Sequence, residues 1–140
     1  MTTYGTARWQ GGLKDGNGAI STKSGALTDY PYGFASRFEG KPGTNPEELI
    51  GAAHAGCFTM ALSLILGEAG FTATEMDTKA EITLEKKDDG FAITKSHLIL
   101  KAKIPGLDEA KFKELTAMAE KGCPVSKLLK AEITLDATLV

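Results

Sequence analysis

The sequence predicts an α+β fold in which an antiparallel β-sheet packs on a long buried central helix. Two segments that alternate apolar and polar residues flank Asp88-Asp89-Gly90, which is typical of a β-hairpin. An 18-residue segment without charge, Leu49 to Leu66, follows clear helix-start signals. Read along the chain, the order of strands, long helix, hairpin, helices and strand is that of an α+β protein.

The first third of the chain is expected to form strands. TARWQ and AISTKSGALT read as two strands joined by the glycine-rich turn GGLKDGNG, and a further extended piece is expected around FASRFEG. Glycine and asparagine in the turn supply the positive φ that a hairpin needs.

The central helix is expected from Pro46 to Ala69, a length of about 36 Å. Asn45 can cap it, Pro46 suits the first helical position, Glu48 can reach back to the cap, and Gly70 ends it. Its small residues lie in the first half, where they would let another helix come close: Gly51, Ala52, Ala55 and Gly56.

The uncharged part of this helix is at the lower length limit for crossing a bilayer. It contains His54, and acidic residues flank it without basic anchors or an aromatic belt. The sequence therefore favours a helix that is apolar almost all round and buried in a soluble core, with no membrane partner.

The second half of the chain completes the sheet. In the hairpin AEITLEKK and GFAITKSHLIL, the inward candidates are Ile82, Leu84, Phe91 and Ile93. Asp108 is expected to cap a helix through about Lys121, which Gly122 closes. Cys123 precedes a short helix, PVSKLLK, and EITLDATLV is expected to be the last strand.

Composition and charge bound the class of protein. The length of 140 residues fits a single domain, 1–140, and 42% apolar with 24% charged residues is ordinary for a soluble globular chain. A net charge of -2 gives no electrostatic reason to expect nucleic acid as a partner. The start MTTYGTARWQ lacks signal-peptide features, so we expect a cytoplasmic protein with reduced cysteines.

The two cysteines are the first candidates for chemistry, because a thiolate is the nucleophile and only about 3% of an ordinary thiol is ionised at pH 7. Cys123 lies at a helix N-terminus and by that rule looks activated. Cys57 lies about three turns into its helix, where apolar neighbours raise its pKa and only a cation from elsewhere could activate it. The alternative is that Cys57 is a small hydrophobe filling a tight helix contact.

His54 lies three residues before Cys57 on the same helix face. It could form a Cys-His pair or half of a metal site, or it could be a core or interface histidine. A structural zinc site needs four ligands in tight pairs, and the chain adds only Cys123 and a strand residue, His97. The sequence therefore predicts no metal site, and it contains no Ser-His-Asp arrangement, phosphate-binding glycine loop or dinucleotide fingerprint.

A set of longer motifs spans essentially the whole chain: PYGF, RFEG, GTNPEELIGAAHAGCF, MALSLILGEAGF, GFAITK and GCPVSKLLKAEITLD. Through these motifs the sequence resembles the OsmC/Ohr family of thiol-dependent organic hydroperoxide reductases. The resemblance implies that Cys57 is the peroxidatic cysteine, Cys123 the resolving cysteine, Arg37 the missing cation, and Glu47 the residue that holds its guanidinium. It implies no role for His54.

The resemblance also implies an antioxidant stress-response enzyme that works as an intertwined homodimer. Cys57 would attack an organic hydroperoxide, release the alcohol and become a sulfenic acid, which Cys123 would convert to a disulfide. A dithiol such as dihydrolipoamide, carried on a lipoylated protein, would reduce the disulfide. No flavin, haem or nicotinamide cofactor is expected, because sulfur carries both electrons.

Spacing raises a separate question about Glu47 and Cys57. Ten residues apart, they are about 15 Å apart along a continuous helix and about 80° out of phase. Either the helix starts later than its capping signals indicate, or the glutamate comes from a second subunit across the small-residue face. Two other classes of function stay open from the residues: a thiol-based sensor, and a structural or lipophilic-ligand-binding dimer with inert cysteines.

Overall fold

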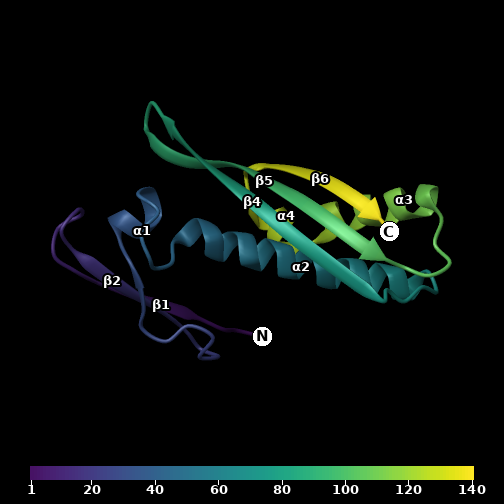
Figure 1. The fold of residues 1–140 in the computed structure, drawn as a ribbon, viewed down its shortest axis with the longest axis horizontal. Coiled ribbons are helices and arrows are strands. Elements are labelled where there is room, and N and C mark those ends of the chain that lie inside the picture. The colour runs from purple at the N-terminus through teal and green to yellow at the C-terminus, as the bar shows by residue number, and fades with distance from the viewer. The chain divides into compact units, whose positions relative to one another are not determined.

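The computed structural model describes residues 1–140, which have a mixed α+β architecture with two sheets (Figure 1). The chain divides into two compact units, Met1–Leu49 and Ile50–Val140, and each is described by itself. The single domain expected over residues 1–140 stays a prediction.

The first unit contains a small antiparallel sheet of β1 (Gly5–Gln10), β2 (Asn17–Thr22) and β3 (Tyr30–Tyr32), in that order. The predicted TARWQ strand is confirmed. Gln10 pairs with Asn17 at the end of the first hairpin, where Gly11 has a φ of +90°. The second strand ends earlier than predicted, at Thr22.

The extended piece predicted around FASRFEG is wrong, because Phe34–Phe38 form a short helix, α1. The Ser36 hydroxyl accepts a hydrogen bond from the Gly33 N–H (2.9 Å) and donates one to the Thr44 carbonyl (2.9 Å). The rings of Phe34 and Phe38, one helical turn apart, lie 5.0 Å from each other. These local contacts favour a helical turn over an extended chain.

The long helix α2 (Pro46–Glu68) begins at the predicted residue. The Glu48 N–H donates to Asn45 Oδ1 at 2.8 Å, and Asn45 Nδ2 donates to Glu48 Oε1 at 2.9 Å, so the capping residues bind each other in both directions. Gly70, with a φ of +87°, follows the end of the helix as predicted.

Helix α2 is buried on one face only. The buried residues are spaced three or four apart along the helix: Gly51, His54, Phe58, Leu62 and Leu66. Met60 and Leu64 are 78% and 64% exposed. The predicted burial of this helix is found on one side only in the single chain, because the rest of its unit covers one side of α2. The helix is long and apolar enough to cross a membrane, a property it shares with core helices of soluble proteins.

The second unit has a sheet of β4 (Glu75–Lys87), β5 (Gly90–Lys103) and β6 (Glu132–Leu139). The predicted β4–β5 hairpin is confirmed. The prediction of a wholly antiparallel sheet is wrong, because β6 pairs parallel with β5. A parallel pair needs a long crossover connection, and the segment carrying the next two helices supplies it.

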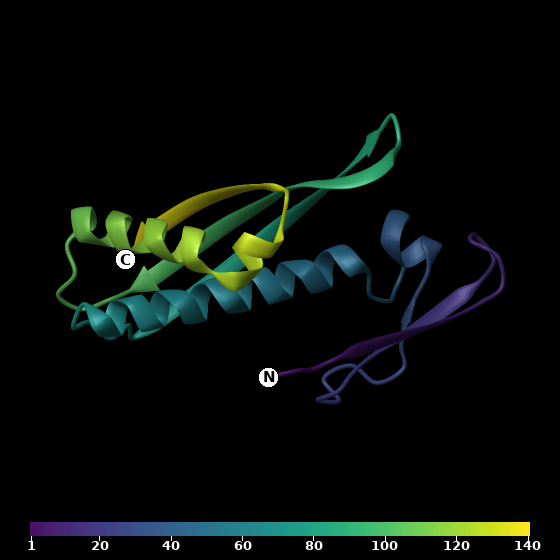
Figure 2. The ribbon, with the colours of Figure 1, turned by 180° about the vertical axis from the view of Figure 1, so that it is seen from behind.

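Two further helices, α3 (Glu109–Gly122) and α4 (Pro124–Leu128), form this crossover. Asp108 caps α3 as predicted, accepting from the Lys111 N–H at 2.8 Å. Helices α2, α3 and α4 lie against the same face of the sheet (Figures 1 and 2). The core between these layers is built from α2, β5 and α3 and includes Phe58, Leu62, Leu66, Leu98, Leu100, Phe112 and Leu115.

The inward-facing hairpin residues differ in part from the prediction. Ile82, Leu84 and Ile93 are half-buried, but Phe91 is 59% exposed. Phe91 pairs with Lys86 next to the hairpin turn, and the buried residues of β5 lie further along the strand, from Ser96 onward. Alternation identifies one face of a strand but does not show how much of that face another layer covers.

Candidate active site

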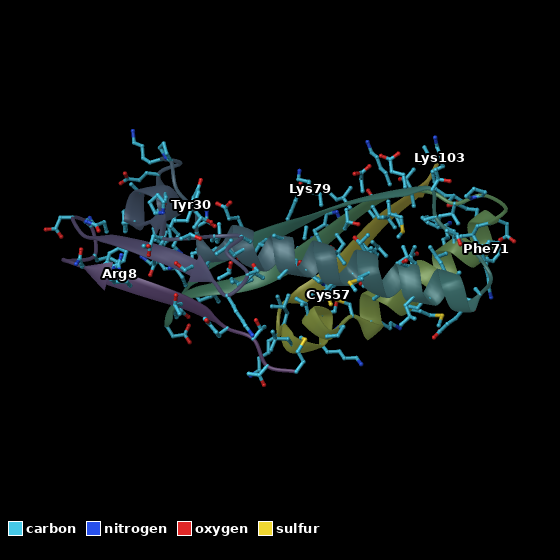
Figure 3. The ribbon with its side chains drawn as sticks, turned by 90° about the horizontal axis from the view of Figure 1, so that it is seen from below. Arg8, Tyr30, Cys57, Phe71, Lys79 and Lys103 are labelled. Atoms are coloured by element: carbon cyan, nitrogen blue, oxygen red, sulfur yellow. The ribbon has the colours of Figure 1, made fainter.

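The second unit places Cys57 and Cys123 next to each other. Cys57 lies midway along α2, beside the part of the chain that carries α4 (Figure 3). Cys123 lies between α3 and α4, as the C-cap of one helix and the N-cap of the next. Both thiols are free; Cys57 is partly exposed and Cys123 is fully buried.

The pKa of the Cys123 thiol lies below its ordinary value. Burial is the largest single influence and raises this pKa, but hydrogen bonds from Cys57, from the Ser126 N–H and hydroxyl, and from the Val125 N–H together outweigh it. The sulfur makes no regular capping hydrogen bond. The hydrogen bond from Cys57 and the donors at the start of α4 favour the thiolate, which is the direction expected for a cysteine at a helix N-terminus.

The pKa of the Cys57 thiol is raised. Burial contributes most, followed by the hydrogen bond to Cys123, and the nearby Cys123 charge acts in the same direction, while the Val125 N–H lowers this pKa. None of these influences comes from a cation. The expectation that the surroundings of Cys57 raise its pKa is confirmed, and Cys57 needs a further group to ionise.

Of the two large apolar residues that follow Cys57 within one helical turn, Phe58 and Met60, one belongs to the core. Phe58 is fully buried, whereas Met60 is 78% exposed. Phe58 therefore has a packing role.

His54 is a fully buried core histidine. Its Nδ1 is 2.6 Å from the Ser96 Oγ and its Nε2 is 2.7 Å from the Ser126 Oγ, so both ring nitrogens are engaged by hydroxyls. Burial lowers the pKa of His54, which keeps the ring neutral at pH 7. The alternative of a Cys-His pair with Cys57 is wrong, since the ring nitrogens bind serines.

The first unit pairs Arg37 with Glu47. Arg37 Nε donates to Glu47 Oε1 (3.0 Å) and Oε2 (3.2 Å), and a terminal guanidinium nitrogen donates to Oε1 at 2.6 Å. The Glu47 side chain is 12% exposed and that of Arg37 is 36% exposed. A geometry with several charge-assisted hydrogen bonds fixes the direction of the guanidinium plane.

Apolar groups border the same arginine. The guanidinium carbon lies 5.2 Å from the centre of the Phe38 ring. Arg37 also lines a cavity of about 170 Å³ together with Trp9, Leu13, Tyr32, Gly33, Phe34 and Phe38. A cation at the edge of an aromatic hollow suits a small organic molecule with a polar end.

The helix between Glu47 and Cys57 is continuous, because α2 runs from Pro46 to Glu68 without interruption. The alternative in which the helix starts after Glu47 is therefore wrong. Within one chain, Glu47 and Cys57 stay about 15 Å apart along the helix axis.

No group of three or more His, Cys, Asp or Glu side chains in the chain could hold a metal ion. His97 lies on β5, where its Nδ1 binds the Thr134 hydroxyl on the neighbouring strand.

Ser126 forms a hydrogen bond with the His54 ring, and the sequence does not single it out. The only signal for it is its position three residues after Cys123, the cap of α4.

Comparison with known proteins places these residues in a family. A profile described as OsmC-like protein matches residues 38–138. Peroxiredoxin OsmC of Escherichia coli (strain K12) is 59% identical over 135 residues, which cover 96% of this chain and 94% of that protein. Organic hydroperoxide resistance protein OhrB of Bacillus subtilis (strain 168) is 32% identical over 123 residues, 87% of this chain and 88% of that protein. The crystal structure of Bacillus subtilis OhrB matches with a TM-score of 0.73 and 27% identity, covering 98% of each chain.

Proposed function

The chain belongs to the OsmC-like protein family, and from that premise we propose that it is a cysteine-based peroxidase that reduces organic hydroperoxides to alcohols. The names of its relatives, a peroxiredoxin and an organic hydroperoxide resistance protein, support this reaction class. The observation that carries the proposal is the pair of free, adjacent thiols of unequal exposure.

The unequal exposure of the two thiols supports the proposed order in which they react. Cys57 is the sulfur that a dissolved peroxide can reach, whereas Cys123 is fully buried. Cys57 is therefore the peroxidatic cysteine and Cys123 the resolving one, although Cys123 has the lower pKa. The lower pKa suits the second step, since a thiolate is also the nucleophile that attacks a sulfenic acid.

The reaction balances on the two sulfurs. The Cys57 thiolate attacks the terminal oxygen of ROOH, an S–O bond forms, the O–O bond breaks, and the alkoxide takes up a proton and leaves as ROH. The Cys123 thiolate then attacks the Cys57 sulfur and displaces hydroxide, which leaves as water after protonation. The two electrons that reduce the peroxide thus come from the pair of thiols, which becomes a disulfide.

Arg37 supplies the cation that Cys57 lacks in its own surroundings. A guanidinium next to Cys57 lowers the pKa of that thiol and stabilises the departing alkoxide. Glu47 holds the guanidinium through the hydrogen bonds described above. The apolar rings around Arg37 suit the organic group of the substrate and favour organic hydroperoxides over hydrogen peroxide.

The active protein is an isologous homodimer in which Arg37 and Glu47 of one subunit serve Cys57 of the other. Two observations support this arrangement. Glu47 and Cys57 are separated along a continuous helix, and the opposite face of α2 exposes Met60 and Leu64. Gly56 and the exposed alanines of α2 would let two copies of the helix cross closely.

A dithiol completes the cycle. Its two thiols become a disulfide as they return Cys57 and Cys123 to thiols, so no bound cofactor takes part. A dihydrolipoyl group on a lipoylated protein in the cytoplasm is the proposed reductant.

The deciding experiment measures turnover of tert-butyl and cumene hydroperoxide with dihydrolipoamide as reductant. The native chain is expected to turn over, Cys57→Ser to be inactive, and Cys123→Ser to accumulate sulfenic acid that dimedone traps. Retained turnover in Cys57→Ser would sink the mechanism. If the native chain turns over slowly but binds a protein partner only when oxidised, a thiol-based sensor is the better description.

A further inference from the structure

A single hydrogen bond connects the two segments of chain that carry the thiols. The Ser126 hydroxyl on α4 lies 2.7 Å from Nε2 of His54 on α2. His54 precedes Cys57 by three residues, and Ser126 follows Cys123 by three. Residues three apart lie on the same face of a helix, and a helix cap faces the third residue of the first turn. The hydrogen bond therefore joins α2 and α4 one helical turn from each thiol, on the stretch where Cys57 lies beside α4 (Figure 3).

Helix α4 has few other restraints on its position. It has five residues, Pro124–Leu128, and none of them is buried. Of these residues, Val125 is the one that packs against the core, and Leu128 is 77% exposed. A helix this short is not stable by itself, because its few internal hydrogen bonds do not offset the cost of ordering the first turn. No other side chain of α4 forms a hydrogen bond with another element, so Ser126 fixes the helix on its α2 side.

The anchor of this hydrogen bond is fixed on both sides. The His54 ring is fully buried, and its Nδ1 is 2.6 Å from the hydroxyl of Ser96, which is also fully buried. Ser96 lies on β5, the middle strand of its sheet. A hydroxyl donates or accepts as required, so both ring nitrogens are satisfied in either tautomer. The ring is therefore held between the sheet and α4, with Nε2 directed at Ser126.

Packing alone does not require a polar ring at this position. A phenylalanine ring would fill the same space with no polar group, whereas burying an imidazole is unfavourable unless each nitrogen finds a partner. No buried side-chain nitrogen or oxygen in the chain lacks a partner. What the polar ring adds is direction, because a hydrogen bond fixes where the Ser126 side chain lies and an apolar contact does not.

We propose that this hydrogen bond is a tether that keeps Cys123 beside Cys57 and so raises the effective concentration of each thiol for the other. His54 and Ser126 are positioning residues in this role, and Ser96 orients the ring. The inference rests on the proposed function, in which the two thiols combine in every turnover. A group that is held in place reacts as if it were far more concentrated than the same group on a mobile segment.

The step that the tether serves is the closing of the disulfide. The Cys123 thiolate gives an electron pair to the sulfur of the Cys57 sulfenic acid, the S–S bond forms, and the S–O bond breaks. The displaced hydroxide takes up a proton and leaves as water. The tether itself makes and breaks no covalent bond, and it sets how often the two sulfurs meet.

A second hydroperoxide molecule competes with this step. The sulfenate of Cys57 attacks the terminal oxygen of that molecule, a second S–O bond forms and the O–O bond breaks. The products are a sulfinic acid and, after protonation of the alkoxide, ROH. A dithiol does not reduce a sulfinic acid, so each such event ends catalysis at one site. The tether therefore also protects Cys57 from irreversible oxidation.

The first test measures the effective concentration without any hydroperoxide or dihydrolipoamide. The chain is equilibrated with mixtures of reduced and oxidised glutathione, and the fraction with a Cys57–Cys123 disulfide is measured by alkylation and mass spectrometry. Ser126→Ala is expected to lower the effective concentration about two- to tenfold, the equilibrium effect of losing one net hydrogen bond. Ser126→Thr, which keeps a hydroxyl, should restore most of it.

His54→Phe separates the tether from any direct effect of Ser126 on its surroundings, because it leaves the Ser126 hydroxyl in place. It should lower the effective concentration as much as Ser126→Ala does. The double variant should be no lower than either single variant, since both remove the same hydrogen bond. Two controls should leave the effective concentration unchanged: His97→Phe, at the chain's other histidine, and Leu66→Val, a destabilising core change near the end of α2.

The second test uses the competition between disulfide closing and further oxidation. Each variant is turned over with dihydrolipoamide and rising concentrations of cumene hydroperoxide, and the sulfinic acid of Cys57 is measured by mass spectrometry. Ser126→Ala and His54→Phe should form it at about two- to tenfold lower hydroperoxide concentrations than the native chain, because the disulfide closes more slowly. His97→Phe should match the native chain.

Circular dichroism establishes that each variant is folded. A native effective concentration in either Ser126→Ala or His54→Phe overturns the proposal. Additive losses in the double variant, or an equal loss in Leu66→Val, also overturn it. If the native chain reduced no hydroperoxide, the proposed function would fail, whereas the glutathione equilibrium would still report on the tether.

Discussion

Mixed dimers offer the sharpest test of how the site is assembled. One subunit carries Glu47→Ala and the other Cys57→Ser, each with a different affinity tag, so that two purification steps isolate only the mixed dimer. Helix α2 is continuous between the two positions, which keeps Glu47 about 15 Å from the Cys57 of its own chain along the helix. In the proposed mechanism, the glutamate that serves Cys57 therefore comes from the other subunit.

The expected activity follows from counting sites. If Glu47 acts across the dimer, the mixed dimer has one complete site and one that lacks both residues, so it should show about half the turnover of the native dimer. If Glu47 acts within its own chain, neither site is complete. The assay is dihydrolipoamide-dependent reduction of tert-butyl hydroperoxide, with both single-variant homodimers as references. A mixed dimer no more active than the Glu47→Ala homodimer would refute the assembly in trans.

Three further variants test other parts of the structure. Arg37→Met is expected to lower kcat/KM for organic hydroperoxides about a hundredfold, the usual effect of losing one donor that stabilises an oxyanion. The control Arg8→Met, at an exposed ion pair, should leave kcat/KM unchanged. Equal losses of kcat/KM in the two variants would contradict a specific role for Arg37. Burial lowers the pKa of His54 below about 6.5, so the unfolded chain binds a proton that the folded chain excludes. Between about pH 6.5 and 5.5, the free energy of unfolding in urea should therefore fall in the native chain by up to about 1 kcal/mol more than it does in His54→Phe. If the free energy of unfolding depends on pH in the same way in both proteins, the buried ring is not neutral. Phe58→Ala, which empties a fully buried site, should cost about 3 to 5 kcal/mol, whereas the exposed Phe91 should cost less than about 1 kcal/mol when changed to alanine.

Local signals were enough for the elements whose ends are set by neighbouring residues. Asn45 and Glu48 bind each other as the capping pattern indicates, and Asp108 caps its helix through the Lys111 N–H. The β4–β5 hairpin follows from alternation around a turn. In each case the deciding contacts lie within a few residues along the chain.

The elements predicted wrongly depend on partners that the local pattern does not contain. The Phe34–Phe38 segment is helical partly because the Ser36 hydroxyl reaches the Thr44 carbonyl eight residues away. The direction of β6 depends on where the α3–α4 crossover returns the chain. One face of α2 is exposed because its unit offers a single layer to cover it.

For the candidate site, the sequence alone determined the two thiols, the helix-start position of Cys123 and the need of Cys57 for a cation, because each depends on residue type and distance along a helix. The tertiary structure alone decided that Cys57 lies next to Cys123, that Arg37 and Glu47 share several hydrogen bonds, and that the His54 ring binds Ser96 and Ser126. These are contacts between groups as far as 72 residues apart in the chain. A contact of that kind forms only when hydrophobic burial has brought separate elements together, and no local pattern encodes which side chains then meet.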